Sequence, residues 1–361
     1  MKGLILAGGA GTRLRPITHT SAKQLVPVAN KPIMFYGIEA MVAAGIRDVG
    51  FVVGDTRDEI MAAVGDGSRW GIKPTFIPQE APLGLAHCVL IAREFLGNDD
   101  FVLYLGDNML QQGLVDLVND FVAARAGGAD DAPSAQILLA RVENPQAFGV
   151  AEIDAAGDVV RLVEKPADPP SDLALVGVYL FDPSIHDAVR AIEPSPRGEL
   201  EITDAIQWLL DHHHRVRHAV LEGWWLDTGK KDPLLESNRR ILESLERRID
   251  GTVDSLSKLE GRVVVEAGAE IVASTVRGPA IIGAGTRIDN SYIGPFTSIA
   301  AGCEIRHSEL EHSVVLECSR IIGVGPVADS LIGREVEVTR SGERPRALRL
   351  MLGDHSTIDL D

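Results

Sequence analysis

The chain has 361 residues, of which 45% are apolar and 24% charged, and its 35 basic and 52 acidic residues give a formal net charge of −17. This length accommodates one large or two modest domains with a well-buried core. The acidic balance argues against a nucleic-acid-binding protein, because such proteins normally present a basic face to the phosphates. It does not exclude small anionic substrates, which respond to local charge.

The cysteines and the apolar runs indicate the compartment. Cys88, Cys303 and Cys318 are odd in number, widely spaced and without a C-x-x-C pair, which argues against a disulfide framework or a zinc site. The N-terminal apolar run is too short for a signal peptide, and no later run approaches the ~18 residues of a membrane span. We therefore expect a cytoplasmic protein that does not interact with membranes.

Charge is unevenly distributed along the chain. Residues 1–38 contain five basic residues and neither Asp nor Glu, so they carry +5 and leave −22 for the remainder. An asymmetry of this kind indicates a segment that handles anions.

Up to about residue 227, short apolar runs alternate with amphipathic stretches, which is typical of parallel βαβ units. The pattern predicts strands at 4–7, 49–53, 75–78 and 101–105, helices at 32–44, 55–64 and 84–95, further strands at 137–141, 150–153, 159–163 and 175–181, and helices at 202–210 and 230–249. Ligands bind outside the carboxyl ends of parallel strands. A site is therefore expected at segments 7–15, 79–86 and 106–110.

The last hundred residues follow a hexapeptide rhythm. Aliphatic residues recur at steps of five or six, which fits neither a helix nor an ordinary strand, at positions 265, 271, 276, 282, 288, 293, 299, 305, 310, 315, 321, 327, 332 and 338. Such spacing predicts a parallel β-helix of four to five coils, in which each face contributes one inward aliphatic residue. A β-sandwich of short strands is the alternative. The open ends of such a prism tend to be capped or paired with another subunit, so we expect a homo-oligomer formed through the β-helix.

A glycine-rich loop follows the first predicted strand. Gly8, Gly9 and Gly11 allow the backbone to turn several N–H groups toward one point, as a phosphate-binding loop does. The pattern is neither a dinucleotide fingerprint nor a Walker loop. A purely structural turn is the alternative, but Arg13 and Lys23 in a segment without acids favour a triphosphate site.

Nine blocks in the first 245 residues carry a family resemblance. They are GGAGTRLRPIT at 8–18, KQLVPV at 23–28, KP at 31–32, QEAPLGLA at 79–86, GDN at 106–108, FGV at 148–150, EKP at 164–166, RGELEITD at 197–204 and WLDTG at 225–229. Together they resemble the sugar-1-phosphate nucleotidylyltransferases, and within that family the glucose-1-phosphate thymidylyltransferases. The hexapeptide tail is a mark of the longer members.

The resemblance implies a fold and an activity. We expect an α/β protein with a Rossmann-like, GT-A-like nucleotidyltransferase domain that has a mixed sheet, followed by a left-handed parallel β-helix. The expected boundaries are a catalytic domain at 1–245, a linker at 246–262, the β-helix at 263–340 and a tail at 341–361. The implied reaction transfers a deoxythymidylyl group from dTTP to α-D-glucose 1-phosphate and releases pyrophosphate. A uridylyl- or guanylyltransferase acting on another sugar, or a non-catalytic nucleotide-sugar sensor, is the alternative.

Both substrates are strongly anionic, so catalysis needs mainly alignment and charge neutralisation. Arg13 can bind the departing phosphates through bidentate hydrogen bonds, while Lys23 can act as a point charge at the α-phosphate. The alternative for either is a solvated surface charge. With Lys165, these are the expected catalytic residues. The nucleotide would be bound by residues of the glycine loop and of segment 79–85: Gly8, Gly9, Gly11, Thr12, Gln79, Gly84 and Leu85.

Asp107 and Asp227 each follow an apolar strand and lie beside a turn. Mg²⁺ typically takes one or two protein carboxylates and completes its shell with phosphate oxygens and water, so this pair is a plausible metal clamp. By resemblance both are Mg²⁺ ligands, and Mg²⁺ is the expected cofactor. The alternative for each is a helix cap.

The resemblance also implies the residues that bind the sugar phosphate. Lys165 and Arg197 would contact the phosphate, Glu164 and the backbone at Gly149 would hold ring hydroxyls together with Asn108, and Leu175 would line the pocket. The alternative for Arg197 is a salt bridge to Glu199 or Glu201.

Overall fold

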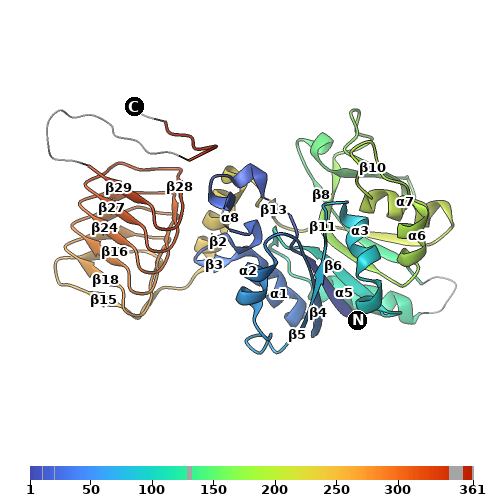
Figure 1. The fold of residues 1–361 in the computed structure, drawn as a ribbon, viewed down its shortest axis with the longest axis horizontal. Coiled ribbons are helices and arrows are strands. Elements are labelled where there is room, and N and C mark those ends of the chain that lie inside the picture. Colours follow the sequence, from blue (N-terminus) through green and yellow to red (C-terminus); the bar gives the residue numbers. More distant parts are fainter. Residues whose placement is uncertain (10, 20, 128–131, 341–352, 360–361) are drawn as a thin grey trace. The chain divides into compact units, whose positions relative to one another are not determined.

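The computed structural model describes residues 1–9, 11–19, 21–127, 132–340 and 353–359 (Figure 1). It divides into two compact units. Unit 1 comprises Met1–Ala10 and Ile33–Leu226, and unit 2 comprises Gly11–Pro32 and Asp227–Asp361. Segment 11–32, expected to carry the catalytic cations, therefore belongs to the same unit as the C-terminal part of the chain.

Unit 1 is built on a mixed sheet. Its parallel part has the order β6 (Phe101–Leu105), β1 (Lys2–Leu6), β4 (Asp48–Val53) and β5 (Lys73–Pro78). The long strand β11 (Leu173–Phe181) pairs antiparallel with β6 and continues the sheet to β8 (Ala135–Arg141), β9 (Gly149–Ile153), β10 (Val159–Glu164) and β12 (Val216–Val220). The predicted α/β fold with a mixed sheet is confirmed.

Helices cover this sheet. They are α1 (Ile33–Ala43), α2 (Arg57–Val64), α3 (Leu85–Ile91), α4 (Arg93–Leu96), α5 (Val115–Ala126), α6 (Ile185–Ala191) and α7 (Ile202–Asp211). The single helix predicted at 84–95 is interrupted at Ala92, whose ψ of 2° leaves the helical region. Helix α5 was not predicted, although buried Leu114, Leu117, Val118 and Phe121 have helical spacing.

The core of unit 1 lies on both sides of the central strands. All nine residues of β11 are buried, because the strand is covered on both faces. Its Phe181 packs against Phe101 of β6, with ring centroids 5.6 Å apart. This rigid centre fixes the carboxyl ends of β1 and β6, from which the loops of the expected site emerge.

In unit 2, three parallel sheets form a left-handed β-helix. One contains β14 (Arg248–Ile249), β17 (Val263–Val265), β20 (Ala280–Ile282), β23 (Thr297–Ile299), β26 (Val314–Val315) and β28 (Leu331–Ile332). The second contains β15 (Thr252–Val253), β18 (Glu270–Val272), β21 (Arg287–Asp289), β24 (Glu304–Arg306), β27 (Arg320–Ile322) and β29 (Glu337–Thr339). The third contains β16 (Lys258–Glu260), β19 (Thr275–Arg277), β22 (Tyr292–Ile293) and β25 (Glu309–Leu310).

The hexapeptide prediction is confirmed rung by rung. All fourteen predicted aliphatic residues belong to one apolar core, the first eleven buried and Val327, Ile332 and Val338 partly buried. The predicted start was wrong, because β14, β15 and β16 pair with β17, β18 and β19 and form a coil where a linker at 246–262 was expected. Two of the sheets therefore hold six strands each, whereas the predicted four to five coils would give each sheet at most five. The predicted tail at 341–361 lies largely outside the described residues.

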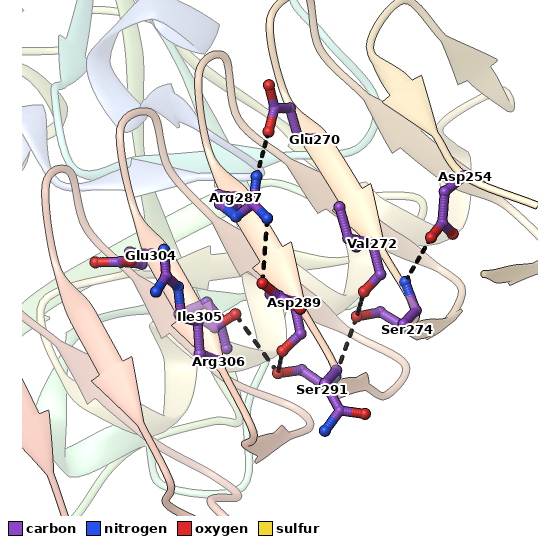
Figure 2. A network of polar contacts seen from close by, with 12 residues as sticks. Asp254, Glu270, Val272, Ser274, Arg287, Asp289, Ser291, Glu304, Ile305 and Arg306 are labelled. Atoms are coloured by element: carbon purple, nitrogen blue, oxygen red, sulfur yellow. Dashed lines mark hydrogen bonds and ion pairs between the residues drawn. The ribbon is translucent and has the colours of Figure 1, made fainter. Parts of the chain in front are cut away.

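Repeated polar contacts hold the coils together (Figure 2). Ser257, Ser274, Ser291 and Ser308 are spaced 17 residues apart, and each of the first three hydroxyls accepts a hydrogen bond from the backbone N–H of the next serine at 3.0–3.2 Å. On the outer face, Arg287 forms ion pairs with Glu270 at 2.6 Å and Asp289 at 3.2 Å. Neighbouring coils are therefore joined by side chains as well as by the backbone.

Helix α8 (Lys231–Ser244) replaces the longer helix predicted at 230–249. It ends at Ser244, before the chain enters the first coil at β14. Among the described residues, no helix combines the length and apolarity needed to cross a bilayer.

Candidate active site

In unit 1, the glycine loop lies at the ends of three parallel strands. A Cβ on Gly8 would be 3.3 Å from Oε1 of Gln79 and 3.4 Å from the nitrogen of Gly54. A Cβ on Gly54 would in turn be 2.9 Å from the carbonyl oxygen of Gly8. The loops after β1, β4 and β5 thus approach within van der Waals distance, and Gly9 follows as an exposed residue. The fold thus brings together Gly8 and Gln79, two of the residues predicted to bind the nucleotide.

The loop at 79–86 is hydrogen bonded to the RGELEITD block at 197–204. The N–H of Leu200 donates to the carbonyl oxygen of Leu83 at 2.7 Å, and the N–H of Ala86 donates to that of Leu200 at 3.0 Å. Gly84 lies between these bonds with φ 103°, and any Cβ there would overlap the backbone of Leu200. Leu85 begins α3 directly after it. The predicted nucleotide loop is therefore a fixed element, attached to the segment that carries Arg197.

Asp107 lies in the turn between β6 and β7 (Asn108–Leu110) and is 8% exposed. Nδ2 of Asn108 donates to Oδ1 of Asp107 at 3.2 Å, while Oδ1 of Asn108 accepts from Nε1 of Trp225 at 2.5 Å. Asn108 is 2% exposed and uses both ends of its amide within the protein. It orients the Asp107 carboxylate, and the helix-cap alternative for Asp107 does not apply because strands flank it.

Glu164, Lys165 and Arg197 line an open cavity of about 720 Å³, together with Arg161, Glu201, Asp204 and Gln207. Arg197 forms ion pairs with Glu201 at 2.8 Å, Glu164 at 3.2 Å and Glu199 at 3.5 Å. Lys165 lies 3.3 Å from Glu164. The structure thus places Lys165 and Arg197, the two side chains predicted to bind the sugar phosphate, in one cavity. It also shows Arg197 paired with Glu199 and Glu201, as the alternative interpretation expects.

The carboxylates of this cavity affect one another. Burial raises the pKa of Asp204, and the nearby charges of Glu201 and Glu164 raise it further, against the opposing effect of Arg197. A site with this many carboxylates favours a ligand that presents hydroxyl donors beside an anionic group that the cations neutralise.

Gly149, Glu164 and Leu175 meet at Thr203, which was not among the predicted site residues. Oγ1 of Thr203 donates to Oε2 of Glu164 at 2.7 Å. A Cβ on Gly149 would be 2.6 Å from Cγ2 of Thr203, 3.1 Å from Oε2 of Glu164 and 3.6 Å from Cδ1 of Leu175. Thr203 lies within the RGELEITD block, so its position in that motif was the available signal.

In unit 2, segment 11–32 is compact. Gly11 has φ 62°, and a Cβ there would be 3.0 Å from Cβ of Lys23. Oγ1 of Thr18 donates to the carbonyl oxygen of Gly11 at 2.6 Å. Short 3-10 helices begin at Thr12 and Lys23, and Arg13 lies within the first.

Arg13 and Asp227 both lie close to Gly229. The N–H of Gly229 donates to Oδ1 of Asp227 at 3.0 Å. A Cβ on Gly229 would be 3.0 Å from that oxygen and 3.6 Å from Nη2 of Arg13. Asp227 ends β13 (Trp225–Asp227), and the N-cap of α8 is Lys230, so Asp227 is not a helix cap. Unit 2 therefore contributes the Arg13 guanidinium and one of the two predicted metal-binding carboxylates.

Each unit holds some of the predicted site residues. Unit 2 holds Gly11, Thr12, Arg13, Lys23 and Asp227, and unit 1 holds the other predicted residues. Within the described residues, no group of three or more His, Cys, Asp or Glu side chains is arranged to hold a metal ion. One or two carboxylates suffice for Mg²⁺ when phosphate oxygens complete its shell.

The comparisons with known proteins identify the family. The sequence profile of the nucleotidyl transferase family matches residues 2–244, and the chain belongs to this family. It is similar to the glucose-1-phosphate thymidylyltransferase of Streptomyces griseus, with 62% identity over 99% of this chain and 98% of that protein. The enzyme of the same name from Streptomyces antibioticus is 58% identical over 100% and 99%. The resemblance predicted from the motifs is confirmed.

A solved structure supports the same family. A putative glucose-1-phosphate thymidylyltransferase from Bacillus anthracis, in complex with sucrose, is 33% identical, with a TM-score of 0.61, and the match covers 66% of this chain and 94% of that one.

Proposed function

We propose that this enzyme transfers a deoxythymidylyl group from dTTP to glucose 1-phosphate and releases dTDP-glucose and pyrophosphate. Full-length similarity to two enzymes of that name supports the proposal. The geometric observation that carries it is the junction at Leu200. There the predicted nucleotide loop is hydrogen bonded to the segment that lines the predicted sugar-phosphate cavity.

In the proposed reaction, a phosphate oxygen of the sugar phosphate attacks the α-phosphorus in line. The new P–O bond forms as the bond to the β-phosphate oxygen breaks, and pyrophosphate leaves. Arg13 would stabilise charge on the departing phosphates, Lys23 charge at the α-phosphate, and Lys165 with Arg197 the attacking phosphate. No nucleophilic side chain is required.

Arg197 would have to exchange partners when substrate binds. Its guanidinium is held by three carboxylates, of which Glu201 is the nearest at 2.8 Å. A sugar phosphate carries charge of the same sign as these carboxylates and accepts bidentate hydrogen bonds from Arg. We propose that the phosphate displaces Glu164 and Glu199 from Arg197, which leaves Glu164 available to the sugar hydroxyls.

Magnesium fits the two predicted carboxylates by donor chemistry. Asp107 and Asp227 supply the hard oxygen ligands that Mg²⁺ prefers, and each already accepts one hydrogen bond that orients it. When bound, the ion would neutralise phosphate charge and polarise the α-phosphoryl group. We propose that these two residues hold it.

Base recognition would depend on Gln79 and the loop at Gly84 and Leu85. Nε2 of Gln79 lies 3.0 Å from Nδ1 of His87, which leaves the carbonyl end of the amide directed toward Gly8. Uracil differs from thymine by one methyl group, a difference that hydrophobic contact resolves by only ~1–3 kcal/mol. Discrimination between dTTP and UTP is therefore expected to be incomplete.

The test is pyrophosphate release from dTTP, glucose 1-phosphate and Mg²⁺, with UTP, GTP and ATP and with mannose and galactose 1-phosphates in parallel. We expect the fastest turnover with dTTP and glucose 1-phosphate. Lys23→Ala should lower kcat by orders of magnitude and leave the melting temperature unchanged. Nucleotide binding without pyrophosphate release would instead favour a non-catalytic sensor, and a faster reaction with GTP and mannose 1-phosphate would favour a guanylyltransferase.

The environment of the enzyme follows from the same proposal. A nucleoside triphosphate and a sugar phosphate are cytoplasmic metabolites, so we propose that the enzyme acts there, without nucleic-acid or membrane partners. We also propose that it forms a homo-oligomer through the β-helix, because the first coil exposes Leu256 (75%) and Ile249 (39%).

A further inference from the structure

Segment 11–32 and the β-helix meet at one buried side chain. Asn238 of α8 is completely buried. Its Oδ1 accepts from the backbone N–H of Ala29 at 2.9 Å and from Oγ of Ser298 at 2.6 Å, and its Nδ2 donates to the carbonyl oxygen of Phe296 at 3.1 Å. One amide thus joins α8, segment 11–32 and the coil that contains β23.

Two direct contacts connect segment 11–32 to the coils. Nδ2 of Asn30 donates to the carbonyl oxygen of Ile299, the last residue of β23, at 2.8 Å. Nη1 of Arg334 donates to Oγ of Ser21 at 3.0 Å. The segment is therefore attached to the β-helix on either side of β2 (Pro27–Val28).

Apolar packing closes the same junction. Ala29 and Leu242 pack with Val264 and Ile281, the middle residues of β17 and β20. Val264 and Ile281 point outward, because the flanking residues of these two strands, Val263, Val265, Ala280 and Ile282, fill the coil interior. Two neighbouring coils therefore present apolar side chains on this sheet, and Ala29 and Leu242 cover them.

The attachment at Ala29 lies six residues from Lys23, one of the two proposed catalytic cations of this segment. Gln24, Val26 and Val28, between Lys23 and Ala29, are all buried. The N–H of Val26 donates to the carbonyl oxygen of Lys23 at 3.2 Å, and Lys23 packs against Gly11 at the other end of the segment. A shift at Ala29 or Asn30 would be transmitted to Lys23, since a close-packed segment has no free space to absorb it.

We propose that the β-helix holds the segment of Arg13 and Lys23 in its catalytic position, with Asn238, Ser298 and Asn30 as positioning residues. The inference rests on the proposed functions of Arg13 and Lys23. It gives the β-helix a direct part in turnover in addition to any part in self-association.

The experiment compares three variants of the full chain. Ser298→Ala removes the hydroxyl that donates to Asn238. Asn30→Asp removes the donor to Ile299 and retains a side chain that tolerates the φ of 60°. Ser291→Ala is the matched control, because it removes another buried hydroxyl of the β-helix that bonds only within the coils.

We expect both test variants to lower kcat by at least about tenfold, because small misplacements of catalytic groups are costly. The KM for glucose 1-phosphate should stay within about twofold of the unaltered enzyme, since that cavity lies in unit 1. Trypsin cleavage after Lys23 should be faster in both. The control should lower the melting temperature and leave kcat unchanged.

The outcomes separate the two proposals. If Ser298→Ala and Asn30→Asp lower only the melting temperature, as the control does, the positioning inference is wrong and the proposed function stands. If the unaltered enzyme releases no pyrophosphate, or Lys23→Ala turns over normally, the proposed function fails first. Asn30 is half-buried, so Asn30→Asp remains informative should Ser298→Ala fail to fold.

Discussion

Single residues of this enzyme are constrained by their backbone neighbours as much as by chemistry. Gly84 is the sharpest case, because its left-handed φ and the backbone of Leu200 both exclude a side chain. Thr203 is another, since its methyl group occupies the space that a Cβ on Gly149 would need. Motif residues in such places are fixed by sterics, and their chemical function follows from that position.

Gly84→Ala tests this steric constraint. The added Cβ must displace the segment at Leu200, so we expect a loss of about 2–4 kcal/mol in the free energy of unfolding. The KM for both substrates should rise together, because the junction connects the two proposed binding regions. Denaturant unfolding and steady-state kinetics measure the two effects. Gly71→Ala is the control, since Gly71 also has a positive φ but a Cβ added there would meet no atom within 4 Å.

The buried side chain of His186 should make the stability of the fold sensitive to acid. It is 3% exposed and stacks on Phe101, and burial, with the charges of Arg93 and Arg190, lowers its pKa to about 4. Below the ordinary value near 6.5, the unfolded chain binds a proton that the folded chain does not. This histidine should therefore destabilise the fold progressively as pH falls from about 6.5 to about 4.

His186→Phe should reduce that dependence. Melting temperatures measured between pH 7 and pH 4.5 should fall less steeply for the variant than for the unaltered enzyme. His213→Asn, which removes an exposed imidazole and tolerates the positive φ there, should leave the slope as it was. Parallel slopes for His186→Phe and the unaltered enzyme would show that His186 does not cause the loss of stability at low pH.

At the scale of elements, the sequence predicted what depends on local periodicity. The fourteen rungs were correct because each inward position repeats within one coil and needs no knowledge of distant contacts. The first coil was missed because the step from Ile249 to Val253 is four residues, which departs from the regular step of five or six. Helix α6 was missed because it is only seven residues long, which is too short for helical periodicity to show clearly.

The serine ladder makes a prediction at this scale. In Ser291→Ala, the N–H of Ser308 loses its acceptor and the carbonyl oxygen of Asp289 loses a donor. Both groups are buried or partly buried, so the free energy of unfolding should fall by about 1–3 kcal/mol. Ser255→Ala, at an exposed position of the first coil, should change stability by less than about 0.5 kcal/mol. Equal effects of the two changes in denaturant unfolding would show that the ladder adds nothing.

For the whole molecule, the sequence could not predict which parts form one unit. The motifs assign Arg13 and Lys23 to the family signature, but nothing local indicates that segment 11–32 packs with residues 227–361. That assignment depends on contacts such as the one between Ala29 and Asn238, which are 209 residues apart. The apolar middle residues at 264 and 281 were the available signal that one face of the β-helix is covered.

Self-association is predicted to depend on the first coil. Leu256→Lys places a charge where 75% of an apolar side chain is exposed, so the proposed oligomer should dissociate toward monomer. Light scattering across a range of concentrations measures the mass. Val122→Lys, on the exposed face of α5, is the control because it adds the same charge at an exposed apolar residue of unit 1. An unchanged mass for Leu256→Lys would place the interface elsewhere.

The way the chain alternates between the units limits how this enzyme can be recombined. The chain passes from one unit to the other after residues 10, 32 and 226, so no single cut separates them. A chimera joined near residue 245 would pair segment 11–32 of one parent with the coils of another and place Ala29 and Asn30 against a foreign surface. Recombination that exchanges 11–32 together with 227–361 would keep the interface within one lineage. We therefore expect the two stretches to be inherited, and best engineered, as a pair.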